Sequence, residues 1–227
     1  MKRICVYGKG GIGKSTAVSN LAAAMAQAGK RVAVVGCDPK ADSTRGLMGR
    51  RIPTVLDQLK TGASGEIAFT DSRGVRCIEA GGPVCGGFSM PLREQVADEV
   101  YLVTTSDFMA LYAANNICRG IRKYAQSGRI RLAGIIHNGR SSVDNDGLLQ
   151  TFATELGTTV AGKIPMSPLI GQAELERQTV VDSAPDSAPA QAFRALASVL
   201  LDNRGGCIPE PMSDDGLEAL CRKAAPL

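Results

Sequence analysis

Two phosphate-binding patterns overlap in the segment YGKGGIGKST, at positions 7 to 16. Its glycines fit the dinucleotide pattern G-x-G-x-x-G, whereas Gly8 to Ser15 fit the P-loop pattern G-x-x-x-x-G-K-S. In a P-loop, successive backbone N–H groups surround the phosphates, a lysine binds the β and γ phosphates, and a hydroxyl ligates Mg²⁺. A dinucleotide site needs neither group, so Lys14 and Ser15 favour a P-loop.

Two alternatives to the P-loop would use the same residues. A dinucleotide site requires an acidic residue about 20 positions after its glycines, and Asp38 follows the apolar run at 32–35. A glycine-rich turn that binds nothing would explain the glycines but not the two lysines. Both alternatives explain fewer of the residues than a P-loop does.

Apolar runs that suit strands alternate along the chain with amphipathic stretches that suit helices. Strands are predicted at 3–7, 32–35, 75–79, 99–104, 131–136 and 159–164, and helices after the P-loop and at 54–60, 107–126, 145–156, 169–178 and 187–202. This order predicts an α/β protein of the P-loop NTPase fold, with a mostly parallel sheet flanked by helices. We expect one ATPase domain over 1–204 and a tail over 205–227 containing a short helix.

Composition limits the partners and the location that can be expected. Of 227 residues, 44% are hydrophobic and 21% charged, and no run approaches the roughly 18 apolar residues of a membrane span. Met1 to Arg3 lead directly into a strand without a signal sequence, so we predict a cytoplasmic protein with no membrane contact. Basic residues between Arg119 and Arg131 lack interleaved aromatics, which favours a solvated face or an acidic protein partner over nucleic acid.

The seven cysteines, at 5, 37, 77, 85, 118, 207 and 221, contain no C-x-x-C pair. This spacing argues against a zinc or thioredoxin-type site, and Cys5 and Cys118 are most simply small core residues. Cys85 differs because two glycines follow it, which lets backbone approach whatever its sulfur binds. That setting is typical of a ligand.

Four segments together resemble the nitrogenase iron protein family, which includes related reductases of chlorophyll biosynthesis. They are GKGGIGKST, VGCDPKADST, VCGGFSMPLRE and YAANNICRGI, and they occur in the family's order over nearly the whole chain. The resemblance implies a homodimer that hydrolyses MgATP and passes electrons to a catalytic, nitrogenase-like reductase component, as in nitrogen fixation. It also implies an electron donor such as ferredoxin or flavodoxin.

The resemblance implies a role for each matching residue. Lys14 would bind the phosphates, Ser15 the Mg²⁺, and Lys9 the phosphates held by the other subunit. The residues expected around the nucleotide are Gly8, Lys9, Gly10, Gly11, Ile12, Gly13, Lys14, Ser15, Thr16, Asp42 and Asn138.

Asp38 would orient or deprotonate the attacking water, Asp42 would lie near the metal, and Asn138, rather than Arg140, would lie near the adenine. The structural alternative for both aspartates is a pair of Asx turns after a strand. His137 is expected to close the end of a strand rather than to bind a ligand.

In this family a 4Fe–4S cluster joins the two subunits through two cysteines from each. Cys85 matches one of them, but the segment with the other is missing between Pro83 and Val84, together with a helix and a strand ending in Asp-x-x-Gly. The missing segment would span on the order of 30 residues or more. Cys77 is a candidate replacement ligand, and its alternative is a small core residue.

Three functions follow from these observations. The first is an ATP-dependent electron carrier with a 4Fe–4S cluster. The second is a cluster-free dimeric ATPase switch resembling the partitioning and septum-site ATPases. The third is an inactive deletion product or a faulty gene model, for which an unpaired sheet and exposed apolar surface are expected.

Overall fold

The computed structural model describes residues 1–62, 65–82, 97–140 and 144–224. These residues form two compact units. The first contains 1–14 and the described parts of 97–166 and 199–224, and the second contains the described parts of 15–82 and 167–198. The boundary between the units passes through the P-loop, directly after Lys14.

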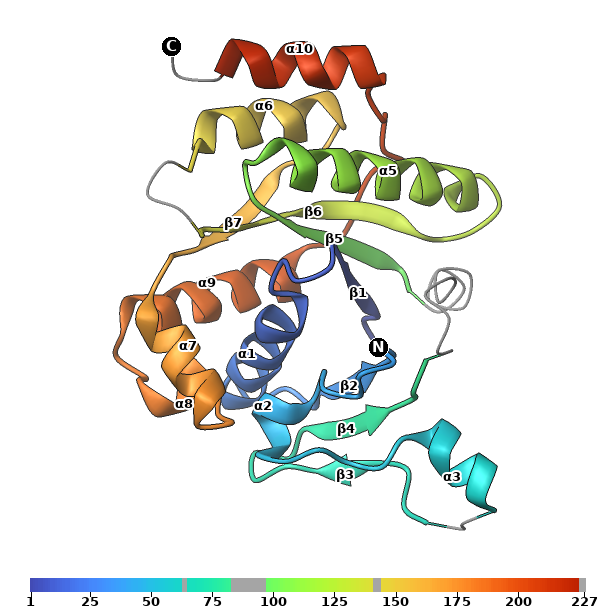
Figure 1. Cartoon of the computed structure of the whole chain (residues 1–227), viewed down its shortest axis with the longest axis vertical. Helices are drawn as coiled ribbons and strands as arrows, with labels where there is room; N and C mark the ends of the chain where they lie inside the picture. Colours follow the sequence, from blue (N-terminus) through green and yellow to red (C-terminus); the bar gives the residue numbers. More distant parts are fainter. Residues whose placement is uncertain (63–64, 83–96, 141–143, 225–227) are drawn as a thin grey trace. The chain divides into compact units, whose positions relative to one another are not determined.

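The first unit is built on a fully parallel sheet. In spatial order its strands are β1 (Ile4–Tyr7), β5 (Glu99–Thr104), β6 (Arg131–Asn138) and β7 (Val160–Ile164). All six residues of β5 are buried, as is usual for an interior strand of a parallel sheet. Figure 1 shows α5 (Phe108–Ala125) and α6 (Asp146–Glu155) on one face of the sheet.

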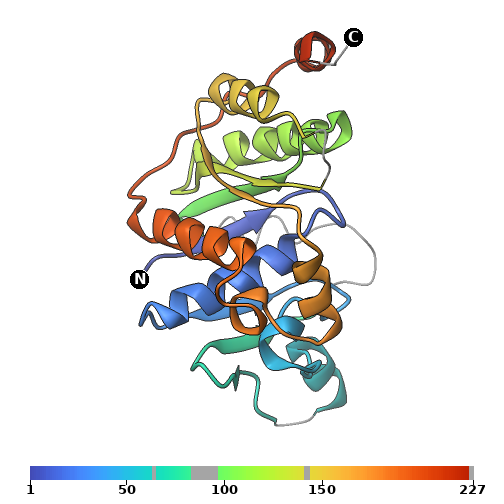
Figure 2. The same ribbon diagram turned by 90° about the vertical axis from the view of Figure 1, so that its left-hand side faces the viewer.

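The second unit contains a separate sheet of three strands. Here β2 (Ala33–Gly36) pairs in parallel with β4 (Arg76–Glu79), and β3 (Phe69–Thr70) pairs with β4 antiparallel. The helices are α1 (Lys14–Gln27, which starts at the unit boundary), α2 (Arg45–Met48), α3 (Val55–Thr61), α7 (Pro168–Leu175), α8 (Val180–Ser183) and α9 (Ala188–Asp202, which enters this unit with its first eleven residues). Figure 2 shows α1 beside α8 and α9, and Asn20 and Gln27 of α1 accept hydrogen bonds from them.

The predicted fold class is confirmed, as are the long helices and six of the strands. The sequence patterns did not predict α2, β3 and α8, since elements of two to four residues are too short to show a period. The predicted sheet is divided between the units, and among the described residues β1 and β2 are edge strands. In β2, the side chain of Val35 is 61% exposed.

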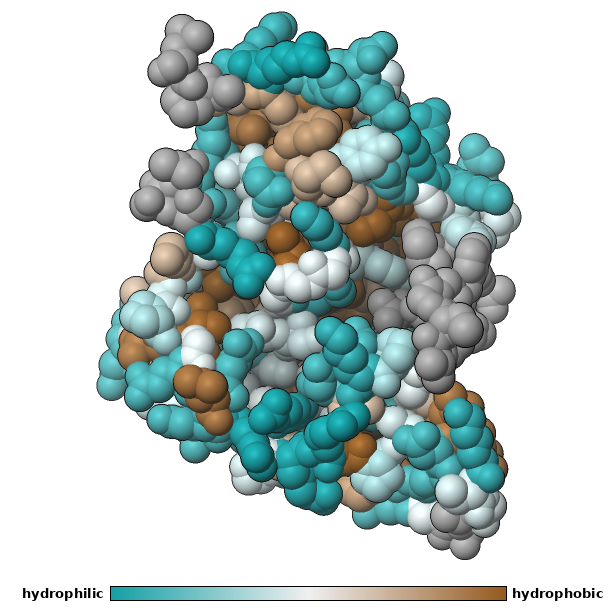
Figure 3. Space-filling model, in the orientation of Figure 1, coloured by the Kyte–Doolittle hydropathy of each residue, from teal (hydrophilic) through white to brown (hydrophobic). Residues whose placement is uncertain are grey.

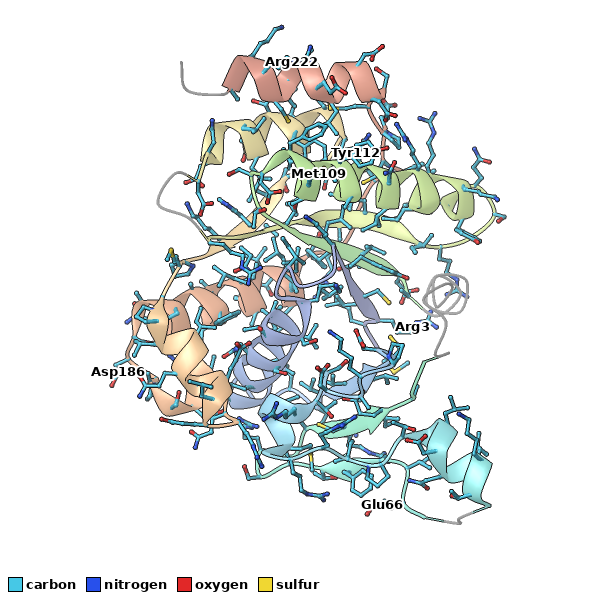
Figure 4. All side chains as sticks on the ribbon, viewed as in Figure 1. Arg3, Glu66, Met109, Tyr112, Asp186 and Arg222 are labelled. Atoms are coloured by element: carbon cyan, nitrogen blue, oxygen red, sulfur yellow. The ribbon has the colours of Figure 1, made fainter. Side chains whose placement is uncertain are left out.

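The tail packs against the first unit. Figure 1 shows α10 (Asp214–Ala224) over α5 and α6, and its Leu217 is fully buried in their shared core with Leu111 and Phe152. The outward surface of α10 is hydrophilic (Figure 3), and Arg222 lies on this outer side (Figure 4). Asn115 of α5 donates a hydrogen bond to the Met212 carbonyl and accepts one from the Met212 N–H, both at 2.9 Å, which fixes the start of the tail.

Replacing Leu217 by alanine is expected to lower the free energy of unfolding by about 2–5 kcal/mol, because the truncation leaves a cavity in a closed core. Urea denaturation measures this loss. Leu175→Ala is the matched control, since Leu175 is 85% exposed and its truncation should change stability by less than about 0.5 kcal/mol. Equal effects of the two substitutions would contradict the packing of the tail.

Candidate nucleotide-binding site

The P-loop glycines serve two different purposes. A Cβ at Gly8 would lie 2.3 Å from the Val103 carbonyl oxygen, and one at Gly13 would lie 2.6 Å from Asn138 Nδ2, so both positions exclude a side chain. A Cβ at Gly10 or Gly11 would meet nothing within 4 Å. The first pair therefore lets the loop pack against β5 and β6, and the second pair leaves backbone open to a ligand.

Lys14 is held across the mouth of this loop. Its ammonium donates to the Lys9 carbonyl oxygen at 2.9 Å, and the N–H of Ile12 donates to the same oxygen at 3.3 Å. The side chain of Lys9 is exposed. An ammonium group on a glycine-rich loop with open space around Gly10 and Gly11 fits a polyphosphate such as that of ATP.

The end of β6 holds the P-loop from the opposite side. Asn138 Nδ2 donates to the Ile12 carbonyl oxygen at 2.8 Å, and Arg140 Nη1 donates to the Gly11 carbonyl oxygen at 2.6 Å. The C=O and N–H of one trans peptide point in opposite directions, so fixing the Ile12 oxygen turns the Gly13 N–H away from Asn138. Sequence reasoning chose Asn138 over Arg140, yet both contact the loop, and the contact of Asn138 with adenine stays a prediction.

The remaining predicted residues lie in the second unit. Ser15 and Thr16 begin the body of α1, where Ser15 is exposed and the Thr16 hydroxyl donates to Glu174. Asp38 Oδ1 accepts the Lys40 N–H at 2.9 Å, which is the Asx turn that the structural alternative predicted. Asp42 follows in the same loop, where its carbonyl accepts the Arg45 N–H at 3.3 Å. The Asx turn of Asp38 is compatible with a catalytic role, because the turn uses only Oδ1 of the carboxylate.

Glu79, at the end of β4, is a fully buried carboxyl group that no motif in the sequence marks. Its Oε1 accepts the Thr44 N–H at 2.7 Å and the Thr44 hydroxyl at 2.8 Å. Burial raises the pKa of this carboxyl, and the nearby carboxylates of Asp42 and Asp38 raise that pKa further. Nothing in the strand pattern marks Glu79, because an acidic residue at a strand end usually faces solvent.

Of the two cysteines predicted as cluster ligands, the structure describes Cys77 but not Cys85. Cys77 is fully buried in β4, where burial raises the pKa of its thiol to about 12. A cluster ligand must be a thiolate, so this geometry favours the core alternative for Cys77. Cys85 lies outside the described residues, and in the part of the chain that the structure describes no three His, Cys, Asp or Glu side chains are placed to hold a metal ion. Among the described residues, Cys77 therefore does not fit the role of a cluster ligand.

His137 is buried in β6, as its predicted role at a strand end requires. Its Nδ1 lies 2.9 Å from Asp146 Oδ1, while Nε2 has no hydrogen-bond partner among the described residues and lies 3.8 Å from Asp144 Oδ2. Burial lowers the pKa of His137 below 6.5, and the two aspartates only partly oppose this effect. His137 is therefore neutral at pH 7.

This lowered pKa makes the stability of the first unit depend on pH. Below pH 6.5 the unfolded chain binds a proton at His137 that the folded protein does not, so the free energy of unfolding should fall as the pH decreases through this range. Urea denaturation at about pH 7.5 and about pH 5.5 measures the change. His137→Gln should show a smaller decrease than the unmodified protein, and an equal decrease would contradict the assignment.

Within the described residues, no helix is both long and apolar enough to cross a membrane.

Comparison of the sequence with protein families gives one match over nearly the whole chain. The family described as "4Fe-4S iron sulfur cluster binding proteins, NifH/frxC family" matches residues 2–83 and 84–225. The match breaks between Pro83 and Val84, where the sequence predicted a missing segment.

Two nitrogenase iron proteins illustrate the similarity. A nitrogenase iron protein of Methanococcus voltae is 44% identical over 97% of this chain and 95% of its own length. Nitrogenase iron protein 2 of Methanothermobacter thermautotrophicus is 43% identical over 98% of both chains. The M. voltae match covers 265 positions, 38 more than the 227 residues of this chain, so that relative has at least 38 residues without a counterpart here.

Solved structures similar to this one share the fold at low sequence identity. The MinD cell division protein of Aquifex aeolicus has a TM-score of 0.71 with 17% identity, covering 91% of this chain and 100% of its own. The cell division ATPase MinD of Pyrococcus furiosus has a TM-score of 0.70 with 22% identity, covering 88% of this chain and 99% of its own. These likenesses confirm the P-loop NTPase fold, and the sequence matches show that the chain belongs to the nitrogenase iron protein family.

Proposed function

We propose that the protein hydrolyses MgATP as a homodimer and uses the nucleotide to control its contact with a nitrogenase-like reductase component. The observation that carries this proposal is the P-loop, where open backbone at Gly10 and Gly11 lies beside the Lys14 ammonium. Membership in the nitrogenase iron protein family supports the same activity. We expect a cytoplasmic location, as for the family.

Each residue has a separate role in this proposal. Bound MgATP supplies the phosphoryl group and the metal charge, Lys14 binds the β and γ phosphates, and the Ser15 hydroxyl ligates Mg²⁺. Lys9, whose side chain is exposed, reaches the phosphates held by the second subunit. Asp38 orients or deprotonates the attacking water from its free carboxylate oxygen, and Asp42 lies near the metal.

Electron transfer is the part of the family's function that these residues do not support. A 4Fe–4S cluster takes four thiolates, and one Cys85 from each of two subunits supplies half of them. Cys77 does not fit the vacant role, because its thiol is buried with a raised pKa. The burial of Cys77 therefore favours a second function, that of a cluster-free dimeric ATPase switch that binds a partner.

Iron analysis separates the two functions. Protein purified without oxygen is assayed for iron and acid-labile sulfide, for MgATP binding, and for molar mass with and without MgATP. About four iron atoms per dimer would establish the electron carrier. A ferredoxin or flavodoxin would then supply its electrons. An iron-free protein that dimerises on binding MgATP would establish the switch. Folded protein that binds no MgATP would contradict both and indicate an inactive deletion product.

Substitutions identify the ligands if iron is present. Cys85→Ser is expected to abolish iron binding, whereas Cys77→Ser should leave the iron content unchanged, since Cys77 lies in the core. Cys221→Ser on α10 is the matched control for the loss of a partly exposed cysteine. Loss of iron in Cys77→Ser with the fold intact would restore Cys77 as a ligand.

A further inference from the structure

Glu79 lies opposite Gly36 at the end of β2, where the loop that carries Asp38 and Asp42 begins. Gly36 pairs with Glu79 in the parallel β2–β4 ladder, and the Ala80 N–H donates to the Gly36 carbonyl at 2.7 Å. A Cβ at Gly36 would lie 2.0 Å from Glu79 Oε2. Only a glycine at position 36 therefore leaves room for this carboxyl group.

The same carboxyl group holds the other end of the loop. Glu79 Oε1 binds both the backbone N–H and the hydroxyl of Thr44, which is the residue before α2. The Thr44 side chain makes no capping bond to its own helix, so its hydroxyl is committed to Glu79. Ser19 of α1 adds a hydrogen bond at 3.2 Å to the Ser43 carbonyl. The loop from 37 to 44, with Asp38 and Asp42, is thus fixed at its two ends.

Stability alone does not account for a carboxyl group in this position. Glu79 is fully buried, and its Oε2 has no hydrogen-bond partner among the described residues. A buried carboxyl group without a cation destabilises the fold compared with an apolar side chain of similar volume. What the buried carboxyl group does provide is a fixed position for Thr44, and therefore for the end of the loop that Thr44 belongs to.

We propose that Glu79 is a positioning residue for ATP hydrolysis, whose carboxyl group holds Thr44 and thereby fixes the loop carrying Asp38 and Asp42. This inference rests on the proposed ATPase function. Glu79 acts through the loop, because both hydrogen bonds of its carboxyl group are made with Thr44. The P-loop has its own contacts within residues 8–14 and with the end of β6. Loss of Glu79 should therefore reduce the turnover rate and leave nucleotide affinity unchanged.

Two variants of nearly equal size test the proposal. Glu79→Leu removes both hydrogen bonds to Thr44, and we expect kcat for ATP hydrolysis to fall by about tenfold with an unchanged KM. Glu79→Gln keeps an oxygen that accepts from Thr44, so its kcat should stay near that of the unmodified protein. Equal kcat in the Leu variant and the unmodified protein, or equal loss in the Leu and Gln variants, would overturn the proposal.

Limited trypsin digestion gives a readout that does not require activity. Lys40 lies exposed in the loop, and Lys30, exposed after α1, serves as the internal reference. Cleavage after Lys40 relative to Lys30 should increase about tenfold in Glu79→Leu and stay unchanged in Glu79→Gln. Unchanged cleavage in Glu79→Leu would contradict the proposal.

This digestion also separates the inference from the proposed function. If the unmodified protein hydrolyses no ATP, the proposed function fails, and the digestion still shows whether Glu79 holds the loop. If Glu79→Leu does not fold by circular dichroism, Thr44→Val takes its place, because it removes only the 2.8 Å hydroxyl bond. Thr44→Val should also lower kcat and increase cleavage at Lys40, and no change in either would overturn the proposal.

Discussion

Replacing Lys14 by alanine is expected to weaken MgATP binding by about 100-fold. The substitution removes charge-assisted hydrogen bonds to the phosphates, each worth about 1.5–3 kcal/mol, and 1.4 kcal/mol corresponds to a tenfold change in affinity. The fold should be largely retained, because the Lys14 ammonium donates to the Lys9 carbonyl within the exposed P-loop and not to the buried core. Isothermal titration calorimetry with MgATP measures the affinity.

Lys30→Ala is the matched control for this prediction. It removes the same charge from an exposed residue after α1 and should leave the affinity for MgATP unchanged. Lys9→Ala provides a second comparison, because Lys9 is proposed to act on the other subunit and should affect hydrolysis in the dimer more than binding by one subunit. If Lys14→Ala bound MgATP as tightly as the unmodified protein, the P-loop assignment would be wrong.

Replacing Asp38 by asparagine is expected to reduce kcat for ATP hydrolysis by about 10²–10⁴, the usual contribution of a general base. The substitution distinguishes the two interpretations of Asp38. An asparagine side chain still accepts the Lys40 N–H, so the Asx turn at 2.9 Å is preserved while the carboxylate is lost. MgATP affinity and the free energy of unfolding should both stay unchanged. Hydrolysis at several MgATP concentrations gives kcat and KM separately.

Unchanged hydrolysis by Asp38→Asn would exclude a catalytic role for Asp38. Full activity in Asp38→Asn would show that this residue serves only the turn after β2. Asp57→Asn is the control, since Asp57 is an exposed aspartate in the first turn of α3 and outside the candidate loop. An equal loss of kcat in both variants would indicate a general effect of charge and would contradict a catalytic role for Asp38.

The local parts of this protein could be predicted from its sequence, because they depend on residues close together in the chain. The period of apolar residues determined α5 and α6, and the strand patterns determined β5 and β6. The P-loop pattern is also local, since it occupies eight consecutive positions, from Gly8 to Ser15. The missing segment was visible for the same reason, as the motifs on its two sides meet at Pro83 and Val84.

Only the tertiary structure determined the contacts that join distant parts of the chain. Asn138 binds the carbonyl of Ile12 across 126 positions, and Glu79 binds Thr44 across 35. Likewise, the burial of Cys77 depends on strands that pair with it from elsewhere in the sequence. No local pattern encodes such contacts, because they arise when parallel strands bring their ends to one edge of a sheet. The sequence thus predicted which residues bind phosphate, and the fold determined which residues hold them in place.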